Sequence, residues 1–202
     1  MTSLLRRAVF RTSPVRAARM YSTQTLPSME EIRAEQDRRE QEIREAESAV
    51  AALGYPEQGI YRQQVVWADL DQFRHVNNAH YIRWIENARM FWFRQLARNL
   101  PPSLHQDIEE GRNIGVILAT NYCRYRRPLN FPDTALVSTA VKMPLERDDR
   151  FKTRSVIYSV NQRAVVAEGE NDIVTYDYNK LQKAPMPQPF REALEAWAYR
   201  GK

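Results

Sequence analysis

The sequence is poor in cysteine and glycine. Its single cysteine, Cys123, excludes an intramolecular disulfide and any zinc or iron–sulfur site that needs several thiolates. The six glycines form neither the GxGxxG pattern of dinucleotide-binding folds nor the GxxxxGK pattern of P-loops. Disulfide scaffolds, multi-cysteine metalloproteins and these two nucleotide-binding classes are therefore excluded.

Long apolar runs are absent as well. No segment reaches the roughly 18 uninterrupted apolar residues that a membrane-spanning helix needs. The basic charge is also uneven: residues 1–22 hold five arginines and no acid, and the remaining 25 basic and 25 acidic residues cancel. A neutral body attracts phosphate backbones weakly, which argues against a nucleic-acid-binding protein.

Residues 1–22 have the composition of a mitochondrial transit peptide. They are rich in Arg, Ser and Ala and can form a basic amphipathic helix around Leu4–Phe10. Arg19-Met20-Tyr21-Ser22 resembles the arginine-anchored cleavage sites of such peptides. We therefore expect a leader that directs the protein to the mitochondrial matrix, with a disordered basic tail as the alternative.

Residues 23–56 are expected to form a charged helical extension. Ser28 and Glu31 have the spacing of a capping box, which predicts a helix that ends before Gly54. The apolar residues of this helix form only a loose stripe: Ile32, Ile43, Ala46, Val50 and Leu53. Because charge runs are usually solvated faces, we expect a solvated arm, with a docking element for a partner as the alternative.

The remaining residues have the pattern of a folded α+β domain. A β-rich run, Tyr61–Ala68, precedes an apolar segment, Ala79–Leu100, that predicts one long helix. The helix carries one apolar stripe: Tyr81, Ile85, Ala88, Trp92 and Leu96. After a short helix, four strand-like runs follow: Gly115–Arg127, Thr134–Met143, Phe151–Asn161 and Ala164–Tyr178. We expect a meander, in an antiparallel sheet of about five strands wrapped around the central helix. Residues 183–202 add a Pro-rich segment and a short helix.

Three motifs in this domain resemble those of a known family. They are WADLDQFRHVNNAHYIRWIENAR (67–89), YRRPLNFPD (125–133) and VVAEGE (165–170). In this order they resemble hot-dog-fold acyl-CoA thioesterases of the 4-hydroxybenzoyl-CoA thioesterase class, near the long-chain acyl-CoA thioesterase branch. The resemblance implies a hot-dog domain over residues 57–182. It also implies a homodimer or a dimer of dimers, with the active site at the subunit boundary.

Asp71 and Asn78 are the candidate catalytic residues. Thioester hydrolysis needs a base or nucleophile near the carbonyl carbon and a hydrogen-bond donor near the carbonyl oxygen. Asp71 precedes the expected start of the long helix, whose first turn offers unpaired N–H groups. The resemblance implies that Asp71 attacks or activates water and that the backbone N–H at Asn78 polarises the carbonyl. Outside this signature, Asp71 would be interpreted as a capping or loop carboxylate.

The neighbouring polar residues have a functional and a structural interpretation. His75 and Asn77 are candidates for substrate binding, although both also suit a structural role in the loop. His75 and His80 lack metal-ligand spacing, and no further His or Cys completes a set, so we expect no metal site. Cys123 lies in a strand-like run and is expected to be a small buried apolar residue.

A basic cluster closes the first of the four strand-like runs. Arg124, Arg126 and Arg127 are candidates for binding the phosphates of CoA, because guanidinium groups pair well with phosphate. A solvated strand face is the alternative, and RNA binding is the third interpretation. One departure from the family pattern is Arg74, where many members have glycine.

Together these features predict a mitochondrial acyl-CoA thioesterase that needs no cofactor. The first alternative is a non-catalytic hot-dog subunit of a mitochondrial assembly such as the mitochondrial ribosome, the one setting in which nucleic acid would be a partner. The charged extension and Arg74 motivate it. The second alternative is a thioesterase that acts on acyl chains bound to a carrier protein.

Overall fold

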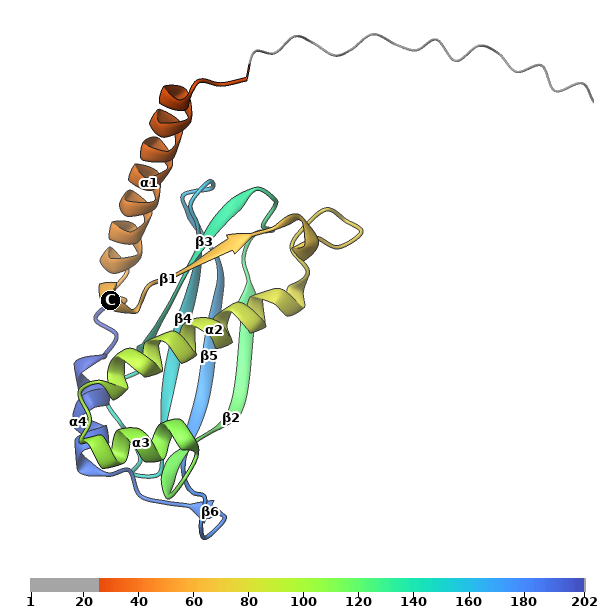
Figure 1. Cartoon of the computed structure of the whole chain (residues 1–202). Helices are drawn as coiled ribbons and strands as arrows, with labels where there is room; N and C mark the ends of the chain where they lie inside the picture. The colour runs from red at the N-terminus through yellow and green to blue at the C-terminus, as the bar shows by residue number, and fades with distance from the viewer. Residues whose placement is uncertain (1–25, 202) are drawn as a thin grey trace, which may run out of the picture. The chain divides into compact units, whose positions relative to one another are not determined.

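Six antiparallel strands form one sheet in the computed structural model, which describes residues 26–201 (Figure 1). The strands are β1 (Tyr61–Val65), β2 (Ile114–Tyr125), β3 (Asp133–Val141), β4 (Arg150–Ser159), β5 (Ala164–Asp177) and β6 (Gln182–Lys183). Their order is β1-β3-β4-β5-β2, and the two-residue β6 pairs with β5. The predicted α+β class is confirmed, and each of the four predicted strand-like runs contains a strand. The short β6 was not predicted.

The expected four-stranded meander is wrong in one respect. Only β3, β4 and β5 are neighbours in sequence order, whereas β2 pairs with β5 at the far edge of the sheet. The backbone N–H groups of Arg126 and Arg127 donate to the carbonyl of Val166, at 2.7 and 3.1 Å. These bonds hold the end of β2 beside β5, and the segment 128–132 then leads back to β3.

The helix α2 (Asn78–Ala97) lies across one face of the sheet (Figure 1). Its predicted stripe is buried at every position: Tyr81, Ile85, Ala88, Trp92 and Leu96. Gly169 of β5 allows the close approach, because an added Cβ there would lie 2.8 Å from the Cδ1 atom of Ile85. The central helix of the predicted fold is therefore confirmed.

Two short helices lie toward the C-terminal end of α2 (Figure 1). The helix α3 (Pro102–Glu110) begins with a proline, whose missing N–H costs nothing in a first helical turn. The helix α4 (Gln188–Ala196) is the predicted C-terminal helix, and it buries Phe190 and Leu194. Just after α4, Trp197 packs edge-on against Trp92 of α2, with 6.2 Å between ring centroids. Within residues 26–201, no helix has the length and hydropathy of a membrane span.

The helix α1 (Met29–Ala52) begins at the predicted capping box. The hydroxyl of Ser28 accepts from the N–H of Glu31 at 3.2 Å, and the Glu31 carboxylate accepts from the N–H of Ser28 at 2.7 Å. These residues belong to a first unit that ends at Gln36, whereas a second unit runs from Asp37. The transit peptide predicted for residues 1–22 lies outside the described residues.

The expectation of a solvated arm is wrong for the second half of α1. Ile43, Ala46 and Val50 are buried. They form one cluster with residues of β3 and β4, together with nearby residues: Tyr55, Leu136, Ala140, Val156, Tyr158 and Val160. Residues 136 and 140 alternate with the residues of β3 that face α2, so α1 covers the opposite face of the sheet. The sheet therefore has a helix on each face.

Ion pairs and a hydrogen bond fix this part of α1 to the domain. The guanidinium of Arg62 on β1 donates to the carboxylates of Glu47 at 2.6 Å and of Glu40 at 3.0 Å. Arg39 donates to the side chain of Asn161 at 2.6 Å. Since Glu40 and Glu47 are two turns apart, Arg62 bridges a long stretch of the helix.

Candidate functional site

A cleft of about 360 Å³ lies beside the N-terminus of α2. Two segments that are distant in sequence meet there: the loop before α2 and the segment after β2. The lining residues are Asp71, His75, Val76, Asn78, Tyr81, Tyr125, Arg126, Arg127 and Pro128. Five of the predicted site residues therefore come together: Asp71, His75, Asn78, Arg126 and Arg127.

A tight turn presents Asp71 to the cleft. The N–H of Asp71 donates to the carbonyl of His75 at 2.8 Å, and the N–H of Arg74 donates back to the carbonyl of Asp71 at 3.0 Å. The Oδ1 atom of Asp71 accepts from the N–H of Phe73 at 2.7 Å. Within residues 26–201 its Oδ2 atom has no hydrogen-bond or ion-pair partner. One carboxylate oxygen is thus held in place while the other is available for chemistry.

Arg74 closes this turn in the left-handed region of backbone space. Its φ angle is 64°, a conformation that glycine adopts at little cost and other residues resist. The sequence departure at this position therefore has a conformational meaning. The Arg74 side chain is exposed and does not line the cleft, so it leaves the approach to Asp71 open.

We expect Arg74→Gly to stabilise the protein by roughly 0.5–1 kcal/mol, because glycine relieves the positive φ. Chemical denaturation of both proteins measures this change. The midpoints are compared when the free energy of unfolding depends equally steeply on denaturant concentration in both proteins. Arg127→Gly serves as the control, since position 127 is not among the residues with a positive φ. A lower midpoint for Arg74→Gly would contradict this interpretation of the turn.

The first turn of α2 is only partly capped. The side-chain Oδ1 atom of Asn77 accepts from the N–H of Ala79 at 3.0 Å. The backbone carbonyl of Asn77 accepts from the N–H of His80 at 3.0 Å. Asn77 is therefore the N-cap, and it does not line the cleft. Among the described residues, the N–H of Asn78 has no acceptor. An unpaired donor at the positive end of a helix dipole can polarise a carbonyl oxygen.

Asn77→Ala is expected to lower the free energy of unfolding by about 1 kcal/mol, because the cap of α2 is lost. Asn77→Ser should retain most of this stability, since a hydroxyl can also accept from the first turn. Urea denaturation of the three proteins compares them. Equal stability of the Ala and native proteins would contradict the capping role and would favour the predicted role in substrate binding.

Two tyrosines complete the wall of the cleft, and the sequence did not single them out. The hydroxyl of Tyr125 donates to the carbonyl of Asn78 at 3.2 Å, which ties the end of β2 to the start of α2. Its ring packs edge-on against Tyr81 at 5.2 Å between centroids. Burial raises the pKa of both phenols, so both stay neutral hydrogen-bonding groups. Tyr125 opens the second quoted motif, which was the available signal.

The basic cluster does not act as a unit. Cys123 is the register partner of Gly169, which faces α2, so the next residue, Arg124, faces away from α2. Arg124 lines a separate polar cavity with Arg154 rather than the cleft, and its role in binding CoA phosphates stays a prediction.

Arg126 lies at the junction of the two cavities. It lines the cleft and the polar cavity, and its Nε atom donates to Glu168 at 2.8 Å. Arg127 lines the cleft, and no ion pair holds it within the described part of the chain. The cleft thus carries guanidinium groups opposite the helix N-terminus, an arrangement that suits an anionic ligand.

Asp69 and Cys123, which flank the site in the sequence, do not line the cleft. Asp69 is buried and accepts from the N–H of Val66 at 2.8 Å, and its carboxylate lies 3.5 Å from the Nδ1 atom of His80. Cys123 is half-buried rather than fully buried as expected, and burial raises the pKa of its thiol, which makes it a poor nucleophile. Over residues 26–201, no three His, Cys, Asp or Glu side chains are grouped to hold a metal ion.

Comparisons with known proteins define the class. The model of the thioesterase-like superfamily matches residues 65–194. The chain therefore belongs to the thioesterase-like superfamily, and its domain is a hot-dog fold, as the sequence motifs predicted. A comparison with curated protein sequences finds no match.

Solved structures show the same fold at low sequence identity. The PA5185 protein from Pseudomonas aeruginosa has a TM-score of 0.60 and 19% identity, over 75% of this chain and 97% of its own. A 1,4-dihydroxy-2-naphthoyl-CoA thioesterase from Synechocystis has a TM-score of 0.56 and 21% identity, over 67% and 93%. A thioesterase complexed with coenzyme A and Zn from Thermus thermophilus has a TM-score of 0.56 and 23% identity, over 74% and 98%. The narrower class and branch stay predictions.

Proposed function

We propose that this chain hydrolyses acyl-CoA thioesters to the free acid and CoA. One observation carries the proposal: the Asp71 carboxylate and the unpaired N–H of Asn78 line the same cleft. A nucleophile or base and a carbonyl-polarising donor are the two groups that thioester hydrolysis requires. Membership of the thioesterase-like superfamily supports this assignment.

The reaction needs little else from the protein. The N–H of Asn78 donates to the thioester oxygen and stabilises the negative charge that develops there, an effect worth about 3–4 kcal/mol in other enzymes. Asp71 either takes a proton from the attacking water or attacks the carbonyl carbon itself, and the acyl–enzyme anhydride is then hydrolysed. The C–S bond breaks, and the thiol of CoA leaves as thiolate, which is a weak base compared with an alkoxide.

Basic side chains line the cleft and can bind the CoA moiety. Arg126 and Arg127 lie on the wall opposite the helix N-terminus and can pair with phosphate. The Thermus thermophilus neighbour holds coenzyme A on the same fold, which supports a CoA thioester as the substrate class. We place the reaction in the mitochondrial matrix on the composition of residues 1–22.

A second copy of the chain fits the edge of the sheet at β2. Over the described residues this edge is unpaired, and it exposes Ile117, Leu118 and Tyr122. On α2, Ile82 and Met90 are exposed as well. Long apolar sheet edges are usually covered, so we infer a homodimer, or a dimer of dimers, that pairs along β2.

The non-catalytic alternative loses the two features that motivated it. The second half of α1 covers its own sheet rather than a partner, and Arg74 serves a left-handed turn without entering the cleft. Neither feature now needs a structural assembly to explain it.

The test is turnover of the purified full-length chain on acyl-CoAs of increasing chain length, with a reagent that reports free thiol. A parallel series presents the same acyl groups on acyl carrier protein. Hydrolysis of the CoA series supports the proposal. Hydrolysis of the carrier-protein series alone would contradict the CoA assignment, and no turnover in either series would overturn the enzymatic function.

A further inference from the structure

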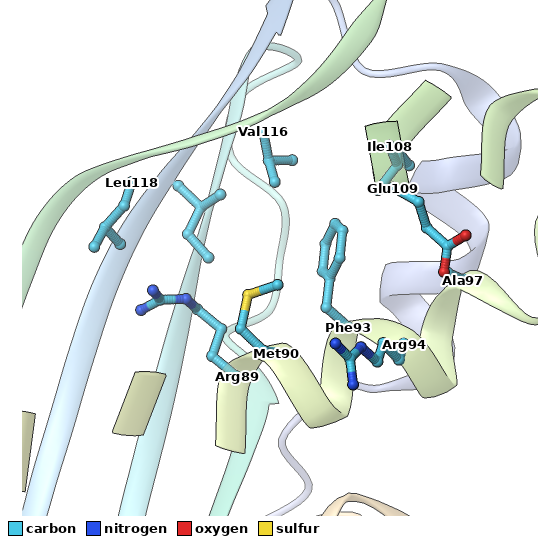
Figure 2. Close-up of a pocket in the computed structure, with 10 residues that line it drawn as sticks. Arg89, Met90, Phe93, Arg94, Ala97, Ile108, Glu109, Val116 and Leu118 are labelled. Carbon is cyan, nitrogen blue, oxygen red and sulfur yellow. The ribbon is translucent and has the colours of Figure 1, made fainter. Parts of the chain in front are cut away.

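A second cavity, of about 440 Å³, lies between α2, α3 and β2 (Figure 2). Most of its lining is apolar: Met90, Phe93, Ala97, Ile108, Val116, Leu118 and Ile173. The charged residues on its wall are Arg89, Arg94 and Glu109. This combination is that of a site for a molecule with a long apolar part and a charged end.

This cavity is separate from the thioester cleft. The two share no lining residue. Asn78 and Arg89 are eleven positions apart on α2, which corresponds to about 16 Å along the helix axis. A ligand in this cavity therefore makes contacts that the proposed hydrolysis of the carbonyl group does not use.

Arg89 is the unusual member of the lining. Its side chain is only 12% exposed, and its Nη1 atom is buried without a hydrogen-bond partner. The nearest carboxylate, that of Glu86, lies 4.0 Å from the other terminal nitrogen and is itself 60% exposed. Burial lowers the pKa of the Arg89 guanidinium, and the Glu86 carboxylate opposes this effect without cancelling it.

A buried guanidinium without an acceptor is costly, because the group stays charged and carries five donors. The other charges on the wall do not relieve it. Glu109 lies 3.2 Å from the imidazole of His105, and Arg94 is exposed and of the same sign. Figure 2 shows the Arg89 side chain extending from α2 toward the strands, whereas Arg94 and Glu109 lie toward α3. Arg89 therefore presents to this cavity the small exposed part of a guanidinium that has no close carboxylate partner.

We propose that this cavity binds an aliphatic carboxylate, with the carboxylate on Arg89 and the chain against Phe93, Val116 and Ile173. The carboxylate pairs with the poorly compensated guanidinium, and the apolar wall removes the chain from water. Such a ligand has two sources: a free fatty acid, or the far end of an acyl-CoA whose chain bears a terminal carboxylate. Both place the same chemistry on Arg89.

The first test measures binding to the full-length chain by calorimetry. Dodecanoate, dodecanol and dodecylammonium share one chain and differ in the charge of the end group. We expect dodecanoate to bind best and Arg89→Met to weaken its binding at least about tenfold, the effect of losing one charged hydrogen bond. Arg83→Met is the matched control: it is exposed on the same helix, lines neither cavity and should leave dodecanoate binding unchanged.

The second test separates the two sources. Hydrolysis of a dodecanoyl-CoA and of its counterpart with a terminal carboxylate is compared in the native and Arg89→Met proteins. A loss in kcat/KM confined to the carboxylated substrate assigns the cavity to the far end of the acyl chain. A loss of dodecanoate binding without that difference assigns it to a free acid.

Three outcomes would overturn the inference: no alkyl ligand binds, the acid, alcohol and amine bind equally, or Arg89→Met binds dodecanoate as the native protein does. No alkyl ligand would bind if a second copy of the chain supplied the acceptor for Arg89. Thermal denaturation checks the fold of Arg89→Met, which removes a buried unpaired charge and should not destabilise the domain. Because binding is measured without turnover, this inference can fail while the hydrolase function holds, and the reverse.

Discussion

Asp71→Asn is expected to hydrolyse acyl-CoA at least about 10²-fold more slowly than the native chain, with the fold retained. The amide has nearly the shape of the carboxylate. Its oxygen can still accept the hydrogen bond from the N–H of Phe73 that holds the Oδ1 atom. It is neither a base nor a nucleophile, and its second group would be a donor. The loss should therefore appear in kcat, while the approach of the substrate past Arg126 and Arg127 is unaffected.

Steady-state kinetics on a substrate that the native chain turns over measures this effect. Glu86→Gln is the matched control, because Glu86 is 60% exposed on α2 and does not line the cleft. Glu86→Gln also replaces a carboxylate by a neutral amide. This variant should hydrolyse the substrate at the native rate. Equal turnover by Asp71→Asn and the native protein would refute the role given to Asp71.

The second large effect is expected at the contact between α1 and the sheet. Val50 is fully buried there, in a cluster with Leu136, Val156 and Tyr158. Val50→Asp should lower the free energy of unfolding by at least about 3 kcal/mol, because it removes a buried apolar side chain and places an unpaired charge against the sheet. Chemical denaturation measures the loss.

Ser48→Asp is the control for this second variant. Ser48 is exposed on the same helix, so its replacement adds the same charge without touching the cluster. We expect its stability to stay within about 0.5 kcal/mol of the native protein. If Val50→Asp were as stable as Ser48→Asp, the second half of α1 would not be packed on the sheet in solution.

The features that the sequence predicted correctly are those set by local pattern. The stripe from Tyr81 to Leu96 repeats with the period of a helix, and that period is visible without knowing what packs against it. The strand-like runs are bounded by turn chemistry that is also local. The turn at Asp71 and the N-terminus of α2 are near each other in sequence, so their meeting in one cleft needed little long-range information.

The errors arose where distant segments meet. The fully buried apolar residues of α1 in the cluster are Ile43, Ala46 and Val50, within a strongly charged helix. Their partners on β3 and β4 form a surface only after the strands have paired. The edge position of β2 has the same origin, because the order of strands in a sheet depends on contacts that no single segment contains.

Within the site, the sequence identified residue types better than their directions. Arg124 and Arg126 belong to one basic cluster, but Arg124 faces away from α2, and only Arg126 reaches the cleft. Arg89 ends the first family motif, yet nothing in the motif indicates that its guanidinium is buried without an acceptor. Burial and unmet hydrogen bonds are properties of the packed molecule.

The position of α1 restricts how copies of this chain can assemble. While Ile43 and Val50 occupy the outer face of β3 and β4, a second sheet has no room to stack there. Growth from a pair to a larger oligomer must use another surface or first release the helix. The ion pairs of Arg62 with Glu40 and Glu47 would then limit the size of the assembly. High salt screens these pairs and would weaken that limit.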